Sequence, residues 1–284
     1  MQKNVLITGC SSGIGRATAE LLRDAGWNVF PTARKTSDLE TLKKAGFSPI
    51  ELDINSSESI KKAVDALLKI TDGKLDALVN NAGFGMPGAI EDLSRDAMRA
   101  QFETNLFGLQ ELTNILIPIF RKNGNGRIVN VSSVVGRLAL PFMGIYSASK
   151  FALEALTDAL RIELSEDPIR LSLIEPGPIK TEFSVNCATQ GESRLPLNAS
   201  RFKSEYKDYF KKRREGGTST DRFRLPPEAV AKKILHALES SHPKIRYRVT
   251  IPAYLGDWAA RFIPRAFLDR LMIRMVKKRF TPSK

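Results

Sequence analysis

Short apolar runs alternate with longer amphipathic segments along most of this chain. The strand-like runs lie near residues 4–8, 28–33, 48–52, 75–80, 126–132, 169–174 and 245–251. The segments between them have helix length and repeat their apolar residues at helical spacing. This alternation predicts an α/β protein with a seven-stranded parallel sheet and helices on both faces. Pro31 predicts that the second strand is shortened or ends irregularly.

The continuity of this pattern predicts one domain over residues 1–284. The chain has 42% apolar content, which is enough to bury one good-sized core. Residues 1–182 carry the regular alternation. Residues 183–225 interrupt it with a charged stretch ending KKRREGG and no clear strand. We therefore expect an insertion there.

Cysteine and histidine usage limits the possible chemistry. The chain has two cysteines, one of them Cys10, and these do not make a disulfide framework. The first strand-like run begins at the N-terminus without a secretory apolar segment before it, so we expect a cytoplasmic protein. His236 and His242 are the two histidines, and they offer too little for a histidine triad or a zinc site. No metal is expected.

A glycine-rich loop follows the first strand-like run. Gly9, Gly13 and Gly15 lie between NVLIT and the helix-like segment RATAELLRDAG. Backbone N–H groups at a helix start are unpaired, and glycines let a phosphate approach them closely. The GxxxGxG spacing differs from the commonest dinucleotide fingerprint, GxGxxG. The loop nevertheless indicates binding of a pyrophosphate.

Tyr146 and Lys150 are four residues apart in the helix-like segment YSASKFALEALTDALRIEL. Residues at this spacing share a helix face, and a nearby ammonium lowers the pKa of a phenol. Such a tyrosine can act as a general acid or base on a carbonyl or alcohol oxygen. Ser133 would hydrogen-bond the same oxygen. The spacing by itself also fits an ordinary amphipathic helix with a solvated lysine.

Several motifs occur together over residues 4–182 and in one order. They are TGCSSGIG (8–15), NNAG (80–83), Asn105, Ser133, Tyr146, Lys150, Pro176-Gly177 and Thr181. In this combination the chain resembles the short-chain dehydrogenase/reductase family. The resemblance implies a doubly wound Rossmann fold and hydride transfer on a nicotinamide cofactor. TGCSSGIG, NNAGFGM, YSASKFALEAL and SLIEPGPIKTEF resemble the 17β-hydroxysteroid and retinol dehydrogenase group, especially bacterial NADP-dependent aldehyde reductases.

The end of the second strand indicates which cofactor is used. An acidic residue there would bind the ribose hydroxyls of NAD, but the sequence reads Thr32-Ala33-Arg34-Lys35. A guanidinium in that place attracts a 2′-phosphate and pairs with it bidentately. We therefore expect NADP(H). The alternative is that Arg34 and Lys35 belong to a solvated loop.

The resemblance also implies the remaining cofactor contacts. Asp53 and Ile54 would flank the adenine, the backbone of residues 81–83 would pack along the cofactor, and residues 176–181 would wrap the nicotinamide. The full expected set is Gly9, Ser11, Ser12, Gly13, Ile14, Gly15, Arg34, Lys35, Asp53, Ile54, Asn81, Ala82, Gly83, Tyr146, Lys150, Pro176, Gly177, Ile179 and Thr181. Asn81 equally fits a turn that stabilises the sheet. Asn105, within a long helix starting near Ser94, would hold a water that links Lys150 to solvent.

Aromatic and aliphatic residues late in the chain suggest an apolar substrate pocket. They are Phe183, Leu195, Phe202, Tyr206, Tyr209 and Phe210 in the insertion, and Tyr254, Leu255 and Trp258 after it. These side chains equally fit a core. The expected substrate is a small lipophilic aldehyde or ketone, or the corresponding alcohol. An NADP(H)-sensing regulatory protein and an epimerase or dehydratase on the same fold remain alternatives.

The net charge of +13 is concentrated in residues 201–214 and 261–284. Residues 258–280 predict a basic amphipathic helix, too short and too charged to span a bilayer. It could lie on an anionic membrane surface, cover the active site of its own or a neighbouring subunit, or pack on the core. Nucleic acid is not an expected partner, because no recognition motif accompanies the charge. The family resemblance implies a homo-oligomer formed through helices near 94–122 and 146–165.

Overall fold

The computed structural model describes residues 2–214 and 223–280, and its centre is one seven-stranded parallel sheet. The strand order is β3-β2-β1-β4-β5-β6-β7. The strands are β1 (Asn4–Ile7), β2 (Asn28–Ala33), β3 (Ile50–Glu51), β4 (Ala77–Asn80), β5 (Gly126–Val131), β6 (Ile169–Pro176) and β7 (Arg246–Val249). The predicted fold class and seven strand positions are confirmed. The order reverses beside β1, and ligands bind at such a switch point.

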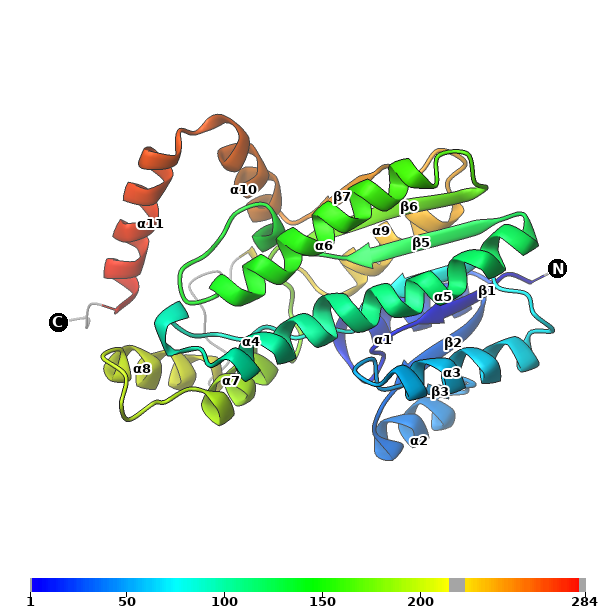
Figure 1. The fold of residues 1–284 in the computed structure, drawn as a ribbon, viewed down its shortest axis with the longest axis horizontal. Helices are drawn as coiled ribbons and strands as arrows, with labels where there is room; N and C mark the ends of the chain where they lie inside the picture. Colours follow the sequence, from blue (N-terminus) through cyan, green and yellow to red (C-terminus); the bar gives the residue numbers. More distant parts are fainter. Residues whose placement is uncertain (1, 215–222, 281–284) are drawn as a thin grey trace.

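Helices cover both faces of the sheet (Figure 1). They are α1 (Gly13–Asp24), α2 (Thr36–Lys44), α3 (Ser57–Ile70), α4 (Arg95–Phe102), α5 (Gly108–Asn123), α6 (Gly144–Glu163), α7 (Phe183–Arg194), α8 (Lys203–Arg214), α9 (Glu228–Glu239), α10 (Ile251–Phe262) and α11 (Arg265–Phe280). Neighbouring strand residues point to opposite faces. Val5 and Ile7 therefore pack with α1 and α9, while Leu6 packs with α3 and α5.

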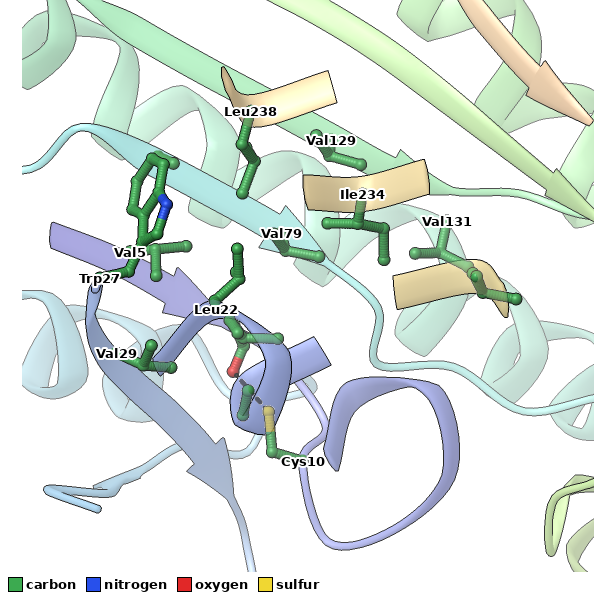
Figure 2. Close-up of a cluster of buried hydrophobic side chains, with 14 of the residues drawn as sticks. Val5, Cys10, Leu22, Trp27, Val29, Val79, Val129, Val131, Ile234 and Leu238 are labelled. Carbon is green, nitrogen blue, oxygen red and sulfur yellow. Dashed lines mark hydrogen bonds between the residues drawn. The ribbon is translucent and has the colours of Figure 1, made fainter. Parts of the chain in front are cut away.

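The core on the α1–α9 side is built from large apolar side chains of both helices and of the strands beneath them. Figure 2 shows Leu22 and Trp27 on one side of this cluster, with Ile234 and Leu238 of α9 on the other and Val79 of β4 between them. The Cys10 thiol also lies here and donates a hydrogen bond to the carbonyl of Ile7 (3.3 Å). Burial raises the pKa of this thiol to about 12, so the Cys10 sulfur is a packing group.

Two local predictions are wrong. β2 runs its full length through Pro31, and this is tolerated because its outer neighbour β3 pairs only with Thr32 and Ala33. The single helix predicted over 258–280 is divided at Pro264 into α10 and α11. Proline lacks an N–H group and disfavours a helical residue before it, so the chain turns there.

The insertion forms α7 and α8, and it is fastened to the segment between β4 and α4. The hydroxyl groups of Tyr206 and Ser200 each donate to the carboxylate of Asp92 at 2.6 Å. Buried apolar residues of the insertion, of this segment and of α4 form one cluster: Met86, Leu93, Ala97, Ala188, Leu195, Tyr206, Tyr209 and Phe210. The insertion is therefore packed onto the body at the carboxyl ends of the strands.

Candidate active site

The glycine loop connects β1 to α1 and has the backbone that its sequence requires. Gly9 and Gly13 have φ values of +72° and +59°, which residues with a Cβ rarely adopt. A Cβ on Gly9 would also lie 2.8 Å from the Cα of Ala82. Ser12, at the N-cap of α1, makes no side-chain capping bond, and the first turn carries no acidic residue. The start of α1 thus fits an anionic phosphate, because its N–H groups have no competing side-chain acceptor.

Asn81 holds this loop in shape from the end of β4. Its side-chain amide donates to the carbonyls of Thr8 and Gly9, both at 2.9 Å, and its backbone N–H donates to the Thr8 hydroxyl. The Asn81 side chain therefore stabilises the turn after β1, which is the alternative role that the sequence allowed. Ala82 also donates its N–H to Thr8, while the exposed Gly83 follows at the surface of the same edge.

The residues expected near the adenosine lie at neighbouring strand ends. Arg34 and Lys35 are exposed directly after β2, and Ser11 and Ser12 are exposed in the glycine loop. After β3, Asp53 is half-buried and accepts a hydrogen bond from the N–H of Asn55 (3.0 Å). Its neighbour Ile54 is buried against the α3–α5 side of the core. The structure places all six at the carboxyl edge of the sheet.

Ser133, Tyr146 and Lys150 come together at the end of β5. Ser133 precedes the short helical turn η3 (Val134–Gly136), where its side chain accepts a hydrogen bond from the Val135 N–H, and it lies near enough to Tyr146 to influence the pKa of the phenol. Tyr146 and Lys150 are buried on α6, with 7% and 5% of their surfaces exposed. The Lys150 ammonium donates to the carbonyl of Val131 at 2.8 Å. The solvated-lysine reading of this motif is therefore wrong.

The prediction that Lys150 lowers the pKa of Tyr146 is also wrong for this structure. Burial raises the pKa of Tyr146 above its usual range, and the nearby Ser133 side chain offsets only part of this rise. Burial lowers the pKa of Lys150 to about 8, against the opposing charge of Glu154. The Lys150 ammonium donates its hydrogen bond to the Val131 carbonyl. Burial is therefore the largest influence on the pKa of the Tyr146 phenol.

Asn105 is fully buried in a π-helical turn, η2 (Glu103–Phe107), between α4 and α5. Its amide donates to the Phe84 carbonyl (3.0 Å) and to the Ser149 hydroxyl (3.1 Å), and its carbonyl oxygen accepts from the Phe84 N–H (3.1 Å). The long helix expected from Ser94 is therefore interrupted at this residue. Single π turns occur often at functional sites. Asn105 fastens the segment after β4 to the helix that carries Tyr146 and Lys150.

Residues 176–181 complete the rim of the site. Pro176 ends β6, and its carbonyl accepts a hydrogen bond from the Ser133 hydroxyl (3.4 Å). Gly177 packs tightly against Thr250, since a Cβ there would lie 2.2 Å from the threonine hydroxyl. A Cβ on Gly13 would lie 3.1 Å from the methyl group of Thr181. The segment therefore bridges Ser133 and the glycine loop, with Ile179 packed on the core below.

Residues of α7 cover Tyr146. The rings of Tyr146 and Phe183 have centroids 5.6 Å apart. Cys187, one helical turn after Phe183, is buried beside them, and both side chains approach Gly85 together with Met143. No pattern in the sequence analysis pointed to Cys187 or Met143 as site residues. The spacing of Cys187 four residues after Phe183 was the available signal.

Three residues expected in the substrate pocket do not reach it. Tyr254, Leu255 and Trp258 lie on the solvent side of α10 and are 55%, 61% and 55% exposed. The insertion residues Leu195, Tyr206, Tyr209 and Phe210 are buried in the cluster described above, and Phe202 packs against it. Within residues 2–214 and 223–280 no group of three or more histidine, cysteine or acidic side chains could hold a metal ion.

Comparison with known proteins gives consistent matches. The model of the short chain dehydrogenase family matches residues 3–191. The chain is 42% identical over 272 residues to the uncharacterized oxidoreductase YbbO of Escherichia coli (strain K12), covering 96% of this chain and 94% of that protein. It is 35% identical over 258 residues to retinol dehydrogenase 8 of Bos taurus, covering 87% and 81%. It is 33% identical over 281 residues to an NADPH-dependent 3-dehydrocapnine reductase of Ornithobacterium rhinotracheale, covering 96% and 97%.

Solved structures agree with these matches. A short-chain dehydrogenase from Streptomyces avermitilis has a TM-score of 0.77 at 30% identity, covering 95% of this chain and 96% of that one. A short chain dehydrogenase/reductase from Burkholderia phymatum in complex with NAD also has a TM-score of 0.77, at 26% identity, covering 100% and 98%.

Proposed function

Since this chain belongs to the short-chain dehydrogenase/reductase family of NAD(P)-binding oxidoreductases, we propose that it exchanges a hydride between NADP(H) and a lipophilic aldehyde or ketone, or the corresponding alcohol. The observation that carries the proposal is the burial of Tyr146 and Lys150 beside Ser133, at the same edge of the sheet as the uncapped start of α1. Nicotinamide supplies the hydride chemistry when bound.

The chain's own residues hold the reacting oxygen and move its proton. The Ser133 hydroxyl lies close enough to the Tyr146 phenol to oppose the rise of its pKa, so a carbonyl oxygen placed beside them would meet two hydroxyl groups. Tyr146 is protonated at neutral pH because its pKa is raised, and it can therefore donate its proton in reduction. Lys150 would supply a buried ammonium to the nicotinamide ribose. Asn105 links α6 to the segment after β4 through its hydrogen bonds to Ser149 and Phe84.

The preference for NADP(H) rests on Arg34. This side chain is exposed at the end of β2, and the residues around it, Thr32, Ala33 and Lys35, include no carboxylate. The relative from Ornithobacterium rhinotracheale is NADPH-dependent by name, whereas the Burkholderia phymatum structure holds NAD, so the relatives differ among themselves. The identity of residue 34 in this chain favours the phosphate-bearing cofactor.

The lipophilic substrate class rests on the apolar cover over Tyr146. Phe183 lies next to the phenol, Met143 and Phe183 both approach Gly85, and the insertion contributes a further apolar cluster. A retinoid-, steroid- or fatty-aldehyde-like carbonyl fits such surroundings, because aromatic and aliphatic side chains bind ligand carbon and leave one polar position for the oxygen. Retinol dehydrogenase 8 is a relative whose name agrees with this class.

Replacing Tyr146 by phenylalanine tests the proposed reaction. NADPH oxidation is followed with a panel of lipophilic aldehydes, ketones and quinones. Tyr146→Phe should lower turnover by about 10² to 10⁴, because the general acid is lost, while NADPH binding measured by nicotinamide fluorescence is retained. Tyr254→Phe, on the solvent side of α10, is the matched control and should retain full activity. Near-normal turnover in Tyr146→Phe would refute the acid role, and NADPH binding without turnover on any carbonyl would favour the sensor.

Replacing Arg34 by alanine tests the cofactor preference. A charge-assisted bond to the 2′-phosphate contributes about 1.5–3 kcal/mol, so kcat/KM for NADPH should fall about 10- to 100-fold. The value for NADH should change little, because NADH has no 2′-phosphate. Wild-type enzyme that prefers NADH would contradict the assignment before any variant is made.

We also infer a homo-oligomer formed through α5 and α6, the helices that the family resemblance indicated. Phe107 on the surface before α5 is 53% exposed, and Leu156 and Ile162 of α6 are 40% and 64% exposed. A second copy would cover these side chains. Light scattering of the purified protein gives the stoichiometry, and a monomer at micromolar concentration would contradict this inference.

A further inference from the structure

The solvent-facing side of α10 has the composition of a helix's buried face. Large apolar residues recur at positions 251, 254, 255, 258 and 262, which lie on one side of a helix. They are Ile251 (64% exposed), Tyr254 (55%), Leu255 (61%), Trp258 (55%) and Phe262 (68%). The inner side carries the small Ala253 and Gly256 and the ion-paired Asp257. A contiguous apolar stripe of this kind marks an interaction site.

The following helix, α11, also exposes apolar residues. Leu268 is buried, while Phe267, Leu271, Ile273 and Met275 are 44–61% exposed. Figure 1 shows α10 and α11 at the same end of the molecule as α7 and α8, with α11 standing apart from the sheet on the far side of α10. We call the exposed residues of Ile251–Phe262 and Arg265–Val276 the α10–α11 surface. None of the helices in the described part of the chain has the length and apolar content of a transmembrane span.

The charge of this surface distinguishes between possible occupants. Arg261, Arg265, Arg270 and Arg274 are exposed along it, whereas Asp257 is buried and Asp269 is the exposed carboxylate. A second copy meeting the surface through a twofold axis would bring arginines against arginines. An anionic bilayer would attract them and accept the apolar stripe, and tryptophan and tyrosine are favoured at the headgroup level.

The α10–α11 surface is rigidly connected to the candidate active site. The Asp257 carboxylate bonds Arg137, which follows η3, at 3.0 Å and Arg248 of β7 at 2.7 Å. A Cβ on Gly256 would lie 2.8 Å from the side chain of Val134, the residue after Ser133. α10 therefore packs directly on the turn that begins with Ser133. A molecule held at this surface therefore lies one helix away from η3 and Ser133.

We propose that the α10–α11 surface docks on an anionic lipid bilayer, and that the protein receives its lipophilic carbonyl substrate from that bilayer. Docking follows from the exposed apolar stripe and the arginines, independently of any reaction. The second part rests on the proposed reductase function. Docking and substrate delivery can be refuted independently of each other, because vesicle binding is measured without cofactor or substrate.

Co-sedimentation of the full chain with vesicles tests the docking. Vesicles are made of phosphatidylcholine alone or mixed with phosphatidylglycerol. The wild type should pellet mainly with the phosphatidylglycerol vesicles, and less at high salt. Leu255→Gln combined with Trp258→Gln should lower the partition coefficient about tenfold or more, because two large apolar side chains no longer enter the interface. Ile70→Gln, at a position of α3 that is 60% exposed, is the matched control and should pellet as the wild type does.

Tryptophan fluorescence locates the contact. The chain has two tryptophans, the buried Trp27 and the exposed Trp258. In a Trp27→Phe variant the emission comes from Trp258, and it should shift to the blue on adding phosphatidylglycerol vesicles. NADPH oxidation with a water-soluble aldehyde should be unchanged in Leu255→Gln/Trp258→Gln, while oxidation with a vesicle-borne aldehyde should fall with the partition coefficient. Equal pelleting of variant and wild type, no pelleting of either, or self-association abolished by the same variant would overturn the proposal.

Discussion

The sheet core and the α10–α11 surface use the same kinds of residue in opposite ways. Phe120 and Leu112 of α5 are fully enclosed beneath the sheet, whereas Trp258 and Phe262 of α10 are more than half exposed. Both helices carry apolar residues at helical spacing. Periodicity therefore marks a side that will be covered, but it does not say whether the protein itself supplies the cover.

Polar groups show the reverse pattern. In the sheet core, the Asn80 side-chain amide donates hydrogen bonds to the side chains of Thr113 and Asn130. The buried Lys150 ammonium donates to the carbonyl of Val131. Along α10 and α11 the arginines remain in solvent. In the sheet core these buried amide and ammonium donors lie next to acceptors, because an unpaired buried donor is costly. The α10–α11 surface instead exposes apolar and cationic side chains, which an external partner can contact.

The largest expected difference between the two regions is in stability. Phe120→Ala should lower the free energy of unfolding by about 3–5 kcal/mol, because a fully buried ring leaves a cavity. Trp258→Ala should change it by about 0.5 kcal/mol or less, as is usual for exposed positions. Denaturant unfolding of both variants measures this. An equal loss in Trp258→Ala would show that α10 is already covered in the isolated protein.

A smaller effect is expected where the two regions join. Asp257→Asn removes the carboxylate that holds Arg137 and Arg248, and bonds to charged groups contribute about 1.5–3 kcal/mol. We expect a loss of this size in the free energy of unfolding. Asp269→Asn, an exposed position on α11, serves as the control and should unfold as the wild type does. A neutral result for Asp257→Asn would mean that α10 is held by packing alone.

The smallest effect concerns pH and separates the cations of the two regions. Lys150 has a pKa lowered to about 8 by burial, so its ammonium is present below pH 8 and lost above it. NADPH affinity should therefore weaken several-fold between pH 7 and pH 9, a change that Lys150→Arg should abolish. Vesicle binding should stay constant over the same range, because arginine does not deprotonate there. A parallel fall in both would assign the pH effect to some other group.

Local patterns were sufficient for the main chain of the core. Apolar runs separated by amphipathic segments predicted the seven strands, since each strand's hydrophobicity reflects its own burial on both faces. The glycine loop was readable because Gly9 and Gly13 take positive φ values that few other residues tolerate. The roles given to Ser133, Tyr146, Lys150 and Asn105 stay predictions, now with a common location.

The features that the sequence did not reveal depend on distant neighbours. The Asn81 amide could face a cofactor or a turn, and its bonds to Thr8 and Gly9 join residues more than seventy positions apart. The raised pKa of Tyr146 comes from burial under α7, and no residue near it in the sequence indicates this. The π turn at Asn105 likewise reflects its bonds to Phe84 and Ser149.

The sequence by itself thus determined the α/β architecture, the cofactor loop and the spacing of the tyrosine and lysine, because each is a property of a short stretch of chain. The tertiary structure alone decided which way α10 faces. Its small inner side packs on η3 and its large apolar side is left outside. The sequence of an amphipathic helix shows that it has an apolar side, but not what buries that side. This depends on which other apolar elements pack into the same core.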